Sequence, residues 1–129
     1  MVGVRLPLHA TAVGKALLCG VPDSRLDELI GAGMLRPFTR TTIVRPSVLR
    51  EQLAAIRHGG IAYSHEEWAL GPSGVAAPVV VGGAVVAAVA IVGPPGATGM
   101  RQRADAVRLA AASVGHALGP VVARATAAA

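Results

Sequence analysis

Three segments of the chain place apolar residues three or four positions apart, which is the spacing of an amphipathic helix. The first follows Asp23, which we expect to cap its N-terminus. The second begins at Pro46, a residue suited to a first helical turn, and Gly59 and Gly60 end it. The third is expected to run from Met100 to about Ala123. The apolar positions are Leu26, Leu29 and Ile30; Leu49, Leu53 and Ile56; and Ala104, Val107, Ala111, Val114 and Leu118.

Residues 75–92 form an apolar stretch of 18 residues without a polar side chain. The stretch is long enough for a transmembrane helix, but Gly82 and Gly83 lie at its centre between two runs rich in β-branched residues. This pattern is typical of two antiparallel strands joined by a Gly-Gly turn. Because both faces of the strands are apolar, we expect the hairpin at the centre of a sheet covered on both sides. Residues 61–67 predict another strand and residues 68–74 a loop.

Length and composition indicate a single domain, 1–129, without repeats or a linker. The net charge is +5, but the arginines are spread along the chain and there are only one Phe, one Tyr and one Trp. A binder of single-stranded nucleic acid needs aromatic stacking platforms, so direct nucleic-acid binding is disfavoured. The single cysteine, Cys19, and the lack of a signal-like N-terminus favour a reducing, cytoplasmic location.

The segment LHATAVGKALLCG contains a Gly-Lys pair, Gly14-Lys15, on a short helix that Thr11 is expected to cap. A phosphate-binding loop would need glycine where His9 stands and a hydroxyl residue where Ala16 stands. The pair therefore does not indicate a nucleotide site.

The remaining polar residues form no recognisable catalytic or metal-binding pattern. No histidine is paired with another ligand at the spacing of a helical metal site. Of His65, Glu66 and Glu67, only His65 and Glu67 would share a strand face, and two ligands do not make a zinc site, so we interpret this segment as an exposed strand end. Ser64 and Ser73 lack the surroundings of a nucleophile elbow. We expect no enzyme activity, no metal and no cofactor.

Five blocks of sequence occur in a familiar order: RLPLHATAVGKALL, FTRTTI, HGGIAYSHEE, GVAAPV and VVAAVAIVGPP. Together they resemble the C-terminal effector-binding domain of the IclR family of bacterial transcription regulators, over about residues 5–119. The resemblance implies an α+β, GAF-like fold with an antiparallel sheet and helices on both faces. It also implies a domain that binds a small-molecule effector and forms a homodimer or tetramer. DNA would be bound through a separate N-terminal winged helix-turn-helix domain, and no membrane contact is expected.

The chain departs from the family pattern at its N-terminus. It contains no DNA-binding segment, and the family domain normally has a helix and two or three strands before the RLPLHAT block. We therefore expect a domain that lacks these elements. Its hairpin would then lose neighbouring strands or part of the layer that packs on it. An exposed apolar strand edge favours association with other chains. The chain is interpreted as a fragment, a truncated reading frame or a remnant that needs a partner.

The resemblance also assigns an effector pocket. In relatives, a turn before the Gly-Lys pair offers backbone donors to a carboxylate, and other positions carry an acidic residue, a cysteine and two serines. The corresponding residues here are Ala12, Val13 and Gly14; Ser64; Pro72 and Gly74; and Ala90 and Val92. Most polar side chains that would hold a small keto acid are thus missing. We expect either an effector more apolar than a keto acid, an aromatic compound for example, or a vestigial pocket.

Three functions follow as hypotheses. The first is the ligand-sensing and oligomerisation domain of an IclR-type regulator. The second is a stand-alone, truncated interaction module that pairs with full-length homologues. The third is a small membrane-associated protein that uses residues 75–92.

Overall fold

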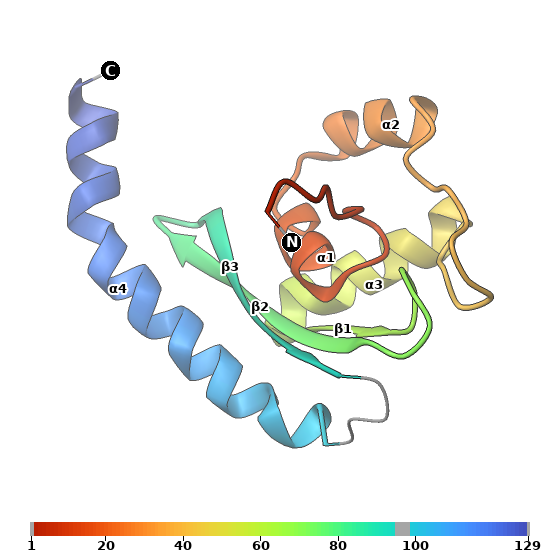
Figure 1. The fold of residues 1–129 in the computed structure, drawn as a ribbon. Coiled ribbons are helices and arrows are strands. Elements are labelled where there is room, and N and C mark those ends of the chain that lie inside the picture. The colour runs from red at the N-terminus through yellow and green to blue at the C-terminus, as the bar shows by residue number, and fades with distance from the viewer. Residues whose placement is uncertain (1, 95–98, 129) are drawn as a thin grey trace.

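A computed structural model describes residues 2–94 and 99–128 of the chain (Figure 1). It has the α+β architecture predicted from the sequence, with a three-stranded antiparallel sheet and helices on both faces. In chain order the elements are α1 (Ala12–Leu18), α2 (Asp23–Gly31), α3 (Pro46–Gly59), β1 (Ala62–His65), β2 (Ser73–Val81), β3 (Ala84–Gly93), a 3₁₀ turn (Arg101–Arg103) and α4 (Ala104–Ala128).

The predicted hairpin is confirmed as β2 and β3. Gly82 and Gly83 join the strands with φ angles of 58° and 81°, a region that glycine enters without the steric cost of a Cβ atom. The strands pair from Ser73 opposite Gly93 to Val81 opposite Ala84. The alternative of a transmembrane helix over residues 75–92 is therefore wrong.

The order of the sheet is β1-β2-β3, so β2 alone is central. Among the described residues, β3 pairs only with β2, and its other edge faces no strand. The expectation of a wholly central hairpin is wrong for β3. Val86 and Val92 are exposed on this strand, whereas Val75, Ala76 and most of their β2 neighbours are buried.

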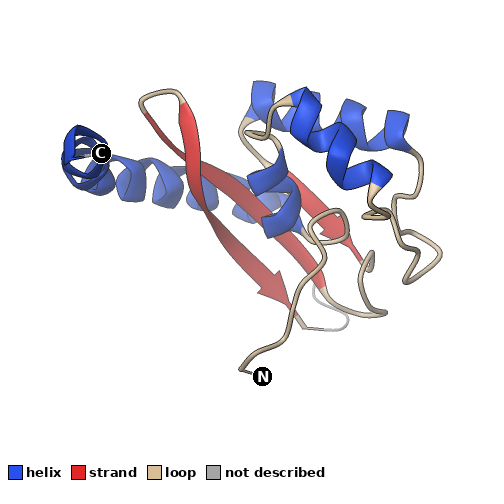
Figure 2. Cartoon of the chain, turned by 90° about the horizontal axis from the view of Figure 1, so that it is seen from above, coloured by secondary structure: helices blue, strands red, loops and turns tan. Residues whose placement is uncertain are grey.

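Two helical layers cover the sheet (Figures 1 and 2). Helix α4 crosses one face, and α1 lies on the other face with α3 behind it. On the α4 side, Val75 and Val79 pack in one core cluster with Val107 and Ala111. On the α1 side, Leu49, Leu53 and Ile56 are buried as the helical spacing predicted, together with Leu26, Ala16 and Leu18.

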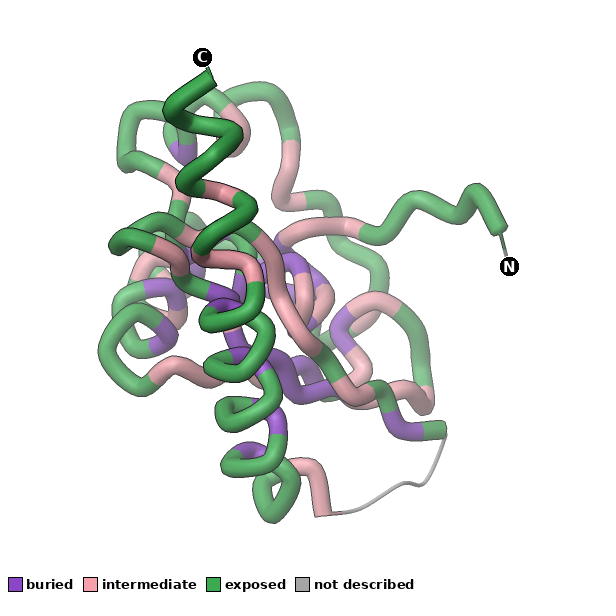
Figure 3. Tube along the Cα trace, turned by 90° about the vertical axis from the view of Figure 1, so that its left-hand side faces the viewer, coloured by how far each residue is buried: buried purple, intermediate pink, exposed green. Residues whose placement is uncertain are grey.

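Helix α4 runs further than predicted and ends at Ala128. Its alanine-rich last turns favour a helix, and Pro120 lies within it without ending it. Gly115 allows close packing, because a Cβ atom there would lie 2.9 Å from the carbonyl oxygen of Val80. Beyond this point the helix is mostly exposed and extends past the hairpin (Figures 1 and 3).

Within residues 2–94 and 99–128, one helix has the length and apolar composition of a membrane span. It covers Arg101–Ala128, and 11% of its apolar window is buried. Length and composition alone are weak evidence for a span, because helices of other kinds meet the same criteria.

Thr11 caps α1 as expected, because its hydroxyl accepts a hydrogen bond from the Gly14 amide and donates one to the Pro7 carbonyl. Gly14 lies directly against the preceding turn. A Cβ atom at this position would lie 2.3 Å from the Leu8 carbonyl oxygen, closer than any real contact. Gly14 therefore allows α1 to pack directly against the backbone of Leu8. This close contact is a structural reason for glycine in the Gly14-Lys15 pair.

Two boundaries differ from the sequence-based expectation. Pro22, not Asp23, is the N-cap of α2, and Asp23 instead supplies negative charge to the first turn, where the helix dipole favours it. Strand β1 ends at His65 because Glu66 has a φ of 50°, which turns the chain out of the sheet.

Leu53→Ala should lower the free energy of unfolding by about 2–5 kcal/mol, because Leu53 is fully buried between α3 and α1. Leu109→Ala is the matched control, since Leu109 is 70% exposed on α4. We expect a change below about 0.5 kcal/mol for the control in urea denaturation. Equal effects of the two substitutions would contradict the described core.

Gly14→Ala should lower the free energy of unfolding by at least about 1–3 kcal/mol, because the methyl group would overlap the Leu8 backbone. Gly31→Ala is the control, because Gly31 is also helical and a Cβ atom there would meet nothing within 4 Å. The control should be neutral or stabilising by up to about 1 kcal/mol. Thermal and chemical denaturation check both, and an unaffected Gly14→Ala protein would argue against the close approach.

Candidate functional site

A cavity of about 220 Å³ lies where the start of α1 meets the loop between β1 and β2 and the ends of β2 and β3. The N-terminal segment contributes to its wall through Leu6. The residues around it are Leu6, Ala10, Thr11, Ala12, Val13, Ser64, Trp68, Ala69, Pro72, Ser73, Gly74 and Val92.

The serine and threonine hydroxyls around the cavity are already bonded to the protein. Ser64 donates its hydroxyl hydrogen to the Ala10 carbonyl at 3.2 Å, and Thr11 uses its hydroxyl to cap α1 and to bind Pro7. The Ser73 hydroxyl lies 3.1 Å from the Nδ1 atom of His65. The surface left for a ligand is therefore mostly apolar.

Six of the eight positions assigned to the effector pocket lie around this one cavity: Ala12, Val13, Ser64, Pro72, Gly74 and Val92. Their contact with an effector stays a prediction. Gly14 and Ala90 lie outside the lining. Gly14 packs against the Leu8 backbone, and Ala90 is an exposed residue on β3, opposite Ala76.

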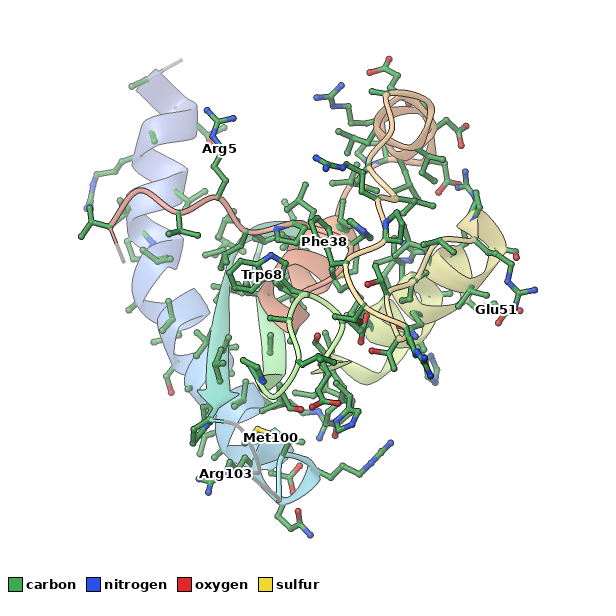
Figure 4. All side chains as sticks on the ribbon, turned by 45° about the vertical axis from the view of Figure 1, so that its right-hand side comes forward. Arg5, Phe38, Glu51, Trp68, Met100 and Arg103 are labelled. Atoms are coloured by element: carbon green, nitrogen blue, oxygen red, sulfur yellow. The ribbon has the colours of Figure 1, made fainter. Side chains whose placement is uncertain are left out.

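Trp68 is the largest of the six lining residues that the sequence analysis did not assign to the pocket. The half-buried ring comes from the loop after β1, and Figure 4 shows it beside the N-terminal segment and α1. Leu6 was missed as well. A signal was present, because the only tryptophan of the chain stands in a predicted loop, where a large apolar ring needs a partner to pack against.

A buried ion pair joins α1 to the loop after β1 and lies outside the cavity lining. The Nζ atom of Lys15 is 3.1 Å from both carboxylate oxygens of Glu67 and donates to the Oε1 atom of Gln52 on α3 at 2.9 Å. The side chains of Lys15 and Glu67 are only 0% and 9% exposed. Burial lowers the pKa of Lys15 below its ordinary value, although the neighbouring carboxylate opposes this shift.

The interpretation of Glu67 as part of an exposed strand end is wrong, because the turn at Glu66 directs the Glu67 side chain inward.

Three threonine hydroxyls hold the backbone of the same loop. Thr39 donates to the Glu66 carbonyl at 2.6 Å, Thr42 to the Glu67 carbonyl at 2.6 Å, and Thr41 to the His65 carbonyl at 2.9 Å. The FTRTTI block thus holds in place the loop that carries Trp68.

The described part of the chain contains no group of three His, Cys, Asp or Glu residues that could hold a metal ion. Cys19 is buried at the end of α1 and donates to the Ala16 carbonyl, and this burial raises the pKa of its thiol. A buried thiol with a raised pKa makes a poor nucleophile.

The sequence of the chain is similar to proteins of one known family. The family model described as the bacterial transcriptional regulator IclR C-terminal domain matches residues 1–116. The chain is 43% identical over 93 residues to the HTH-type transcriptional repressor AllR of Klebsiella pneumoniae, which is 71% of this chain and 34% of that protein. The match thus spans about a third of the relative's length.

Solved structures show the same fold. The IclR structure of Thermotoga maritima matches with a TM-score of 0.83 and 31% identity, over 92% of this chain and 50% of that one. The inducer-binding domain of the transcription factor PobR from Acinetobacter, a double mutant in complex with 3-hydroxybenzoic acid, matches with a TM-score of 0.80 and 29% identity, over 89% of this chain and 69% of that one.

These relatives are transcription regulators and not enzymes, which confirms the expectation that the chain has no catalytic role. IclR-type regulators respond to small molecules and bind DNA. The resemblance seen in the sequence is thereby confirmed: the chain belongs to the IclR family of bacterial transcription regulators and corresponds to their C-terminal domain.

Proposed function

We propose that the chain is the effector-binding domain of an IclR-type regulator, and that its effector is a small aromatic compound. The apolar cavity beside Trp68 carries this proposal, because the serine and threonine hydroxyls around it are already bonded to the protein. A small keto acid would find few side-chain partners there, and a buried polar group without partners is costly.

The size of the cavity supports an aromatic ligand. An apolar cavity of about 150 Å³ accommodates benzene. A cavity of about 220 Å³ therefore has room for a ring with a small substituent. The related PobR domain was solved with 3-hydroxybenzoic acid, which makes this acid a reasonable first probe. The backbone amides of Ala12 and Val13, at the start of α1, are the proposed partners of its carboxylate.

The proposed consequence of binding is regulation at a distance. DNA would be bound by a separate winged helix-turn-helix domain, in a cytoplasmic homodimer or tetramer. An effector that binds one state of this assembly more tightly shifts its population and so changes operator affinity.

3-Hydroxybenzoate and benzoate should raise the melting temperature of the protein, while glyoxylate and pyruvate should not, because the cavity offers apolar contact and few free polar side chains. Trp68→Ala should weaken binding by roughly tenfold or more in titration calorimetry, as expected for an aromatic residue central to a pocket. Leu70→Ala is the control, because Leu70 lies on the same loop and is 79% exposed. Stabilisation by the keto acids alone would refute the aromatic effector.

The edge of β3 favours a second function, that of a stand-alone module that pairs with full-length homologues. Residues 84–93 contain no charged residue and no proline, the features that commonly protect an edge strand. Within the described residues, the outer edge of this strand has no strand partner. We propose that another strand, from a longer homologue or a second copy, covers this edge.

Ala90→Lys should abolish such pairing, because Ala90 is exposed in the middle of β3 and a lysine there blocks strand addition. Leu109→Lys on α4 is the control with the same change in charge. Light scattering after size exclusion should show an oligomer for the wild type and the control and a smaller species for Ala90→Lys. A wild-type monomer that does not co-elute with a longer homologue would count against the pairing module.

A further inference from the structure

The buried pair Lys15–Glu67 needs an explanation beyond stability. Removing two charges from water is costly, and replacing a buried ion pair by apolar residues is often neutral or stabilising. Lys15 is nevertheless fully buried, and its ammonium group is bonded to Glu67 and Gln52. A buried ion pair of this kind is expected where the relative position of two elements has to be fixed.

The sequence positions of Lys15 and Glu67 show which two elements the ion pair connects. Lys15 lies on α1 two residues after Val13, and Glu67 directly precedes Trp68. Val13 and Trp68 both line the cavity, one on α1 and one on the loop after β1. The ion pair is therefore a side-chain bond between the two elements that form these walls of the pocket.

The other bonds that fix this loop act mainly on its backbone. Leu70 is exposed, and Glu66 adopts a left-handed conformation that costs free energy for a residue with a side chain. The loop is held by hydrogen bonds to its backbone carbonyls and by one from the Gly71 amide to the Glu66 carboxylate. Among the side chains of the loop, Glu67 makes the buried connection to α1.

We propose that Lys15 and Glu67 are positioning residues, which hold the Trp68 wall against the α1 wall and so set the affinity of the pocket for its effector. This inference rests on the proposed function for the effector, but the position of Trp68 can be measured without any ligand. Neither residue lines the cavity, so the pair acts through Trp68 and through the start of α1.

Trp68 is the only tryptophan in the chain, so its fluorescence reports the loop directly. In Lys15→Met/Glu67→Met, two flexible apolar side chains replace the ions and should leave the protein folded. We expect a red-shifted emission maximum and stronger quenching by acrylamide, because the ring leaves its half-buried position. Binding of 3-hydroxybenzoate should weaken about tenfold through the loss of preorganisation.

Asp27→Asn is the control, since it breaks an exposed ion pair with Arg50 far from the pocket. It should change neither the emission maximum, nor the quenching, nor the affinity.

Glu67→Gln covers the case in which the double variant does not fold. It keeps the shape of Glu67 and a hydrogen-bond acceptor for Lys15 while it removes the charge, and it should shift the Trp68 emission in the same direction. Unchanged emission and quenching in the folded variants would overturn the proposal. If the wild type binds no aromatic acid, the proposed effector fails, but the fluorescence still decides whether the pair positions the loop.

Discussion

The burial of β2 on both faces is the constraint on which the rest of the molecule depends. The strand carries no charge, and its faces can be buried only if a layer packs on each side. Small residues let both layers come close. A Cβ atom at Gly74 would lie 3.4 Å from Ala12 on α1, and one at Gly115 would lie 2.9 Å from the backbone of Val80. The spacing of the three layers thus follows from glycine and alanine at the points of contact.

The pocket is a consequence of this packing. Helix α1 begins next to Gly74, and its first turn lies over the end of β2, where the sheet provides a floor but no large side chain to fill the space. The loop after β1 closes the space from the side with Trp68. The polar groups at this point belong to the protein's own caps and turns, which is why the cavity is apolar although its surroundings contain serine and threonine.

The parts of the fold that depend on local pattern could be predicted from the sequence. The Gly82-Gly83 hairpin and the buried face of α3 follow from the spacing of apolar residues and from turn chemistry, which neighbouring positions determine. The burial of Glu67 and the place of Trp68 could not be predicted in this way. Both depend on a contact with α1, about 50 residues earlier in the chain, and on the left-handed turn at Glu66, which no local pattern indicates. The resemblance to a family found six positions around the cavity because it carries information on tertiary contacts that periodicity lacks.

In the proposed effector site, the cavity and the ion pair have different physical roles. An apolar cavity gains affinity from the area it buries, but apolar contact has little direction and tolerates a shift of its walls. An ion pair with several hydrogen bonds adds little net stability in a protein interior, but its energy depends steeply on distance and angle. Because Lys15 and Glu67 lie outside the cavity lining, the lining stays apolar while, in the proposed role, the ion pair sets the positions of its walls. The strand that forms the floor can then be largely apolar, because the shape of the pocket is set by the helix and the loop that face each other above it.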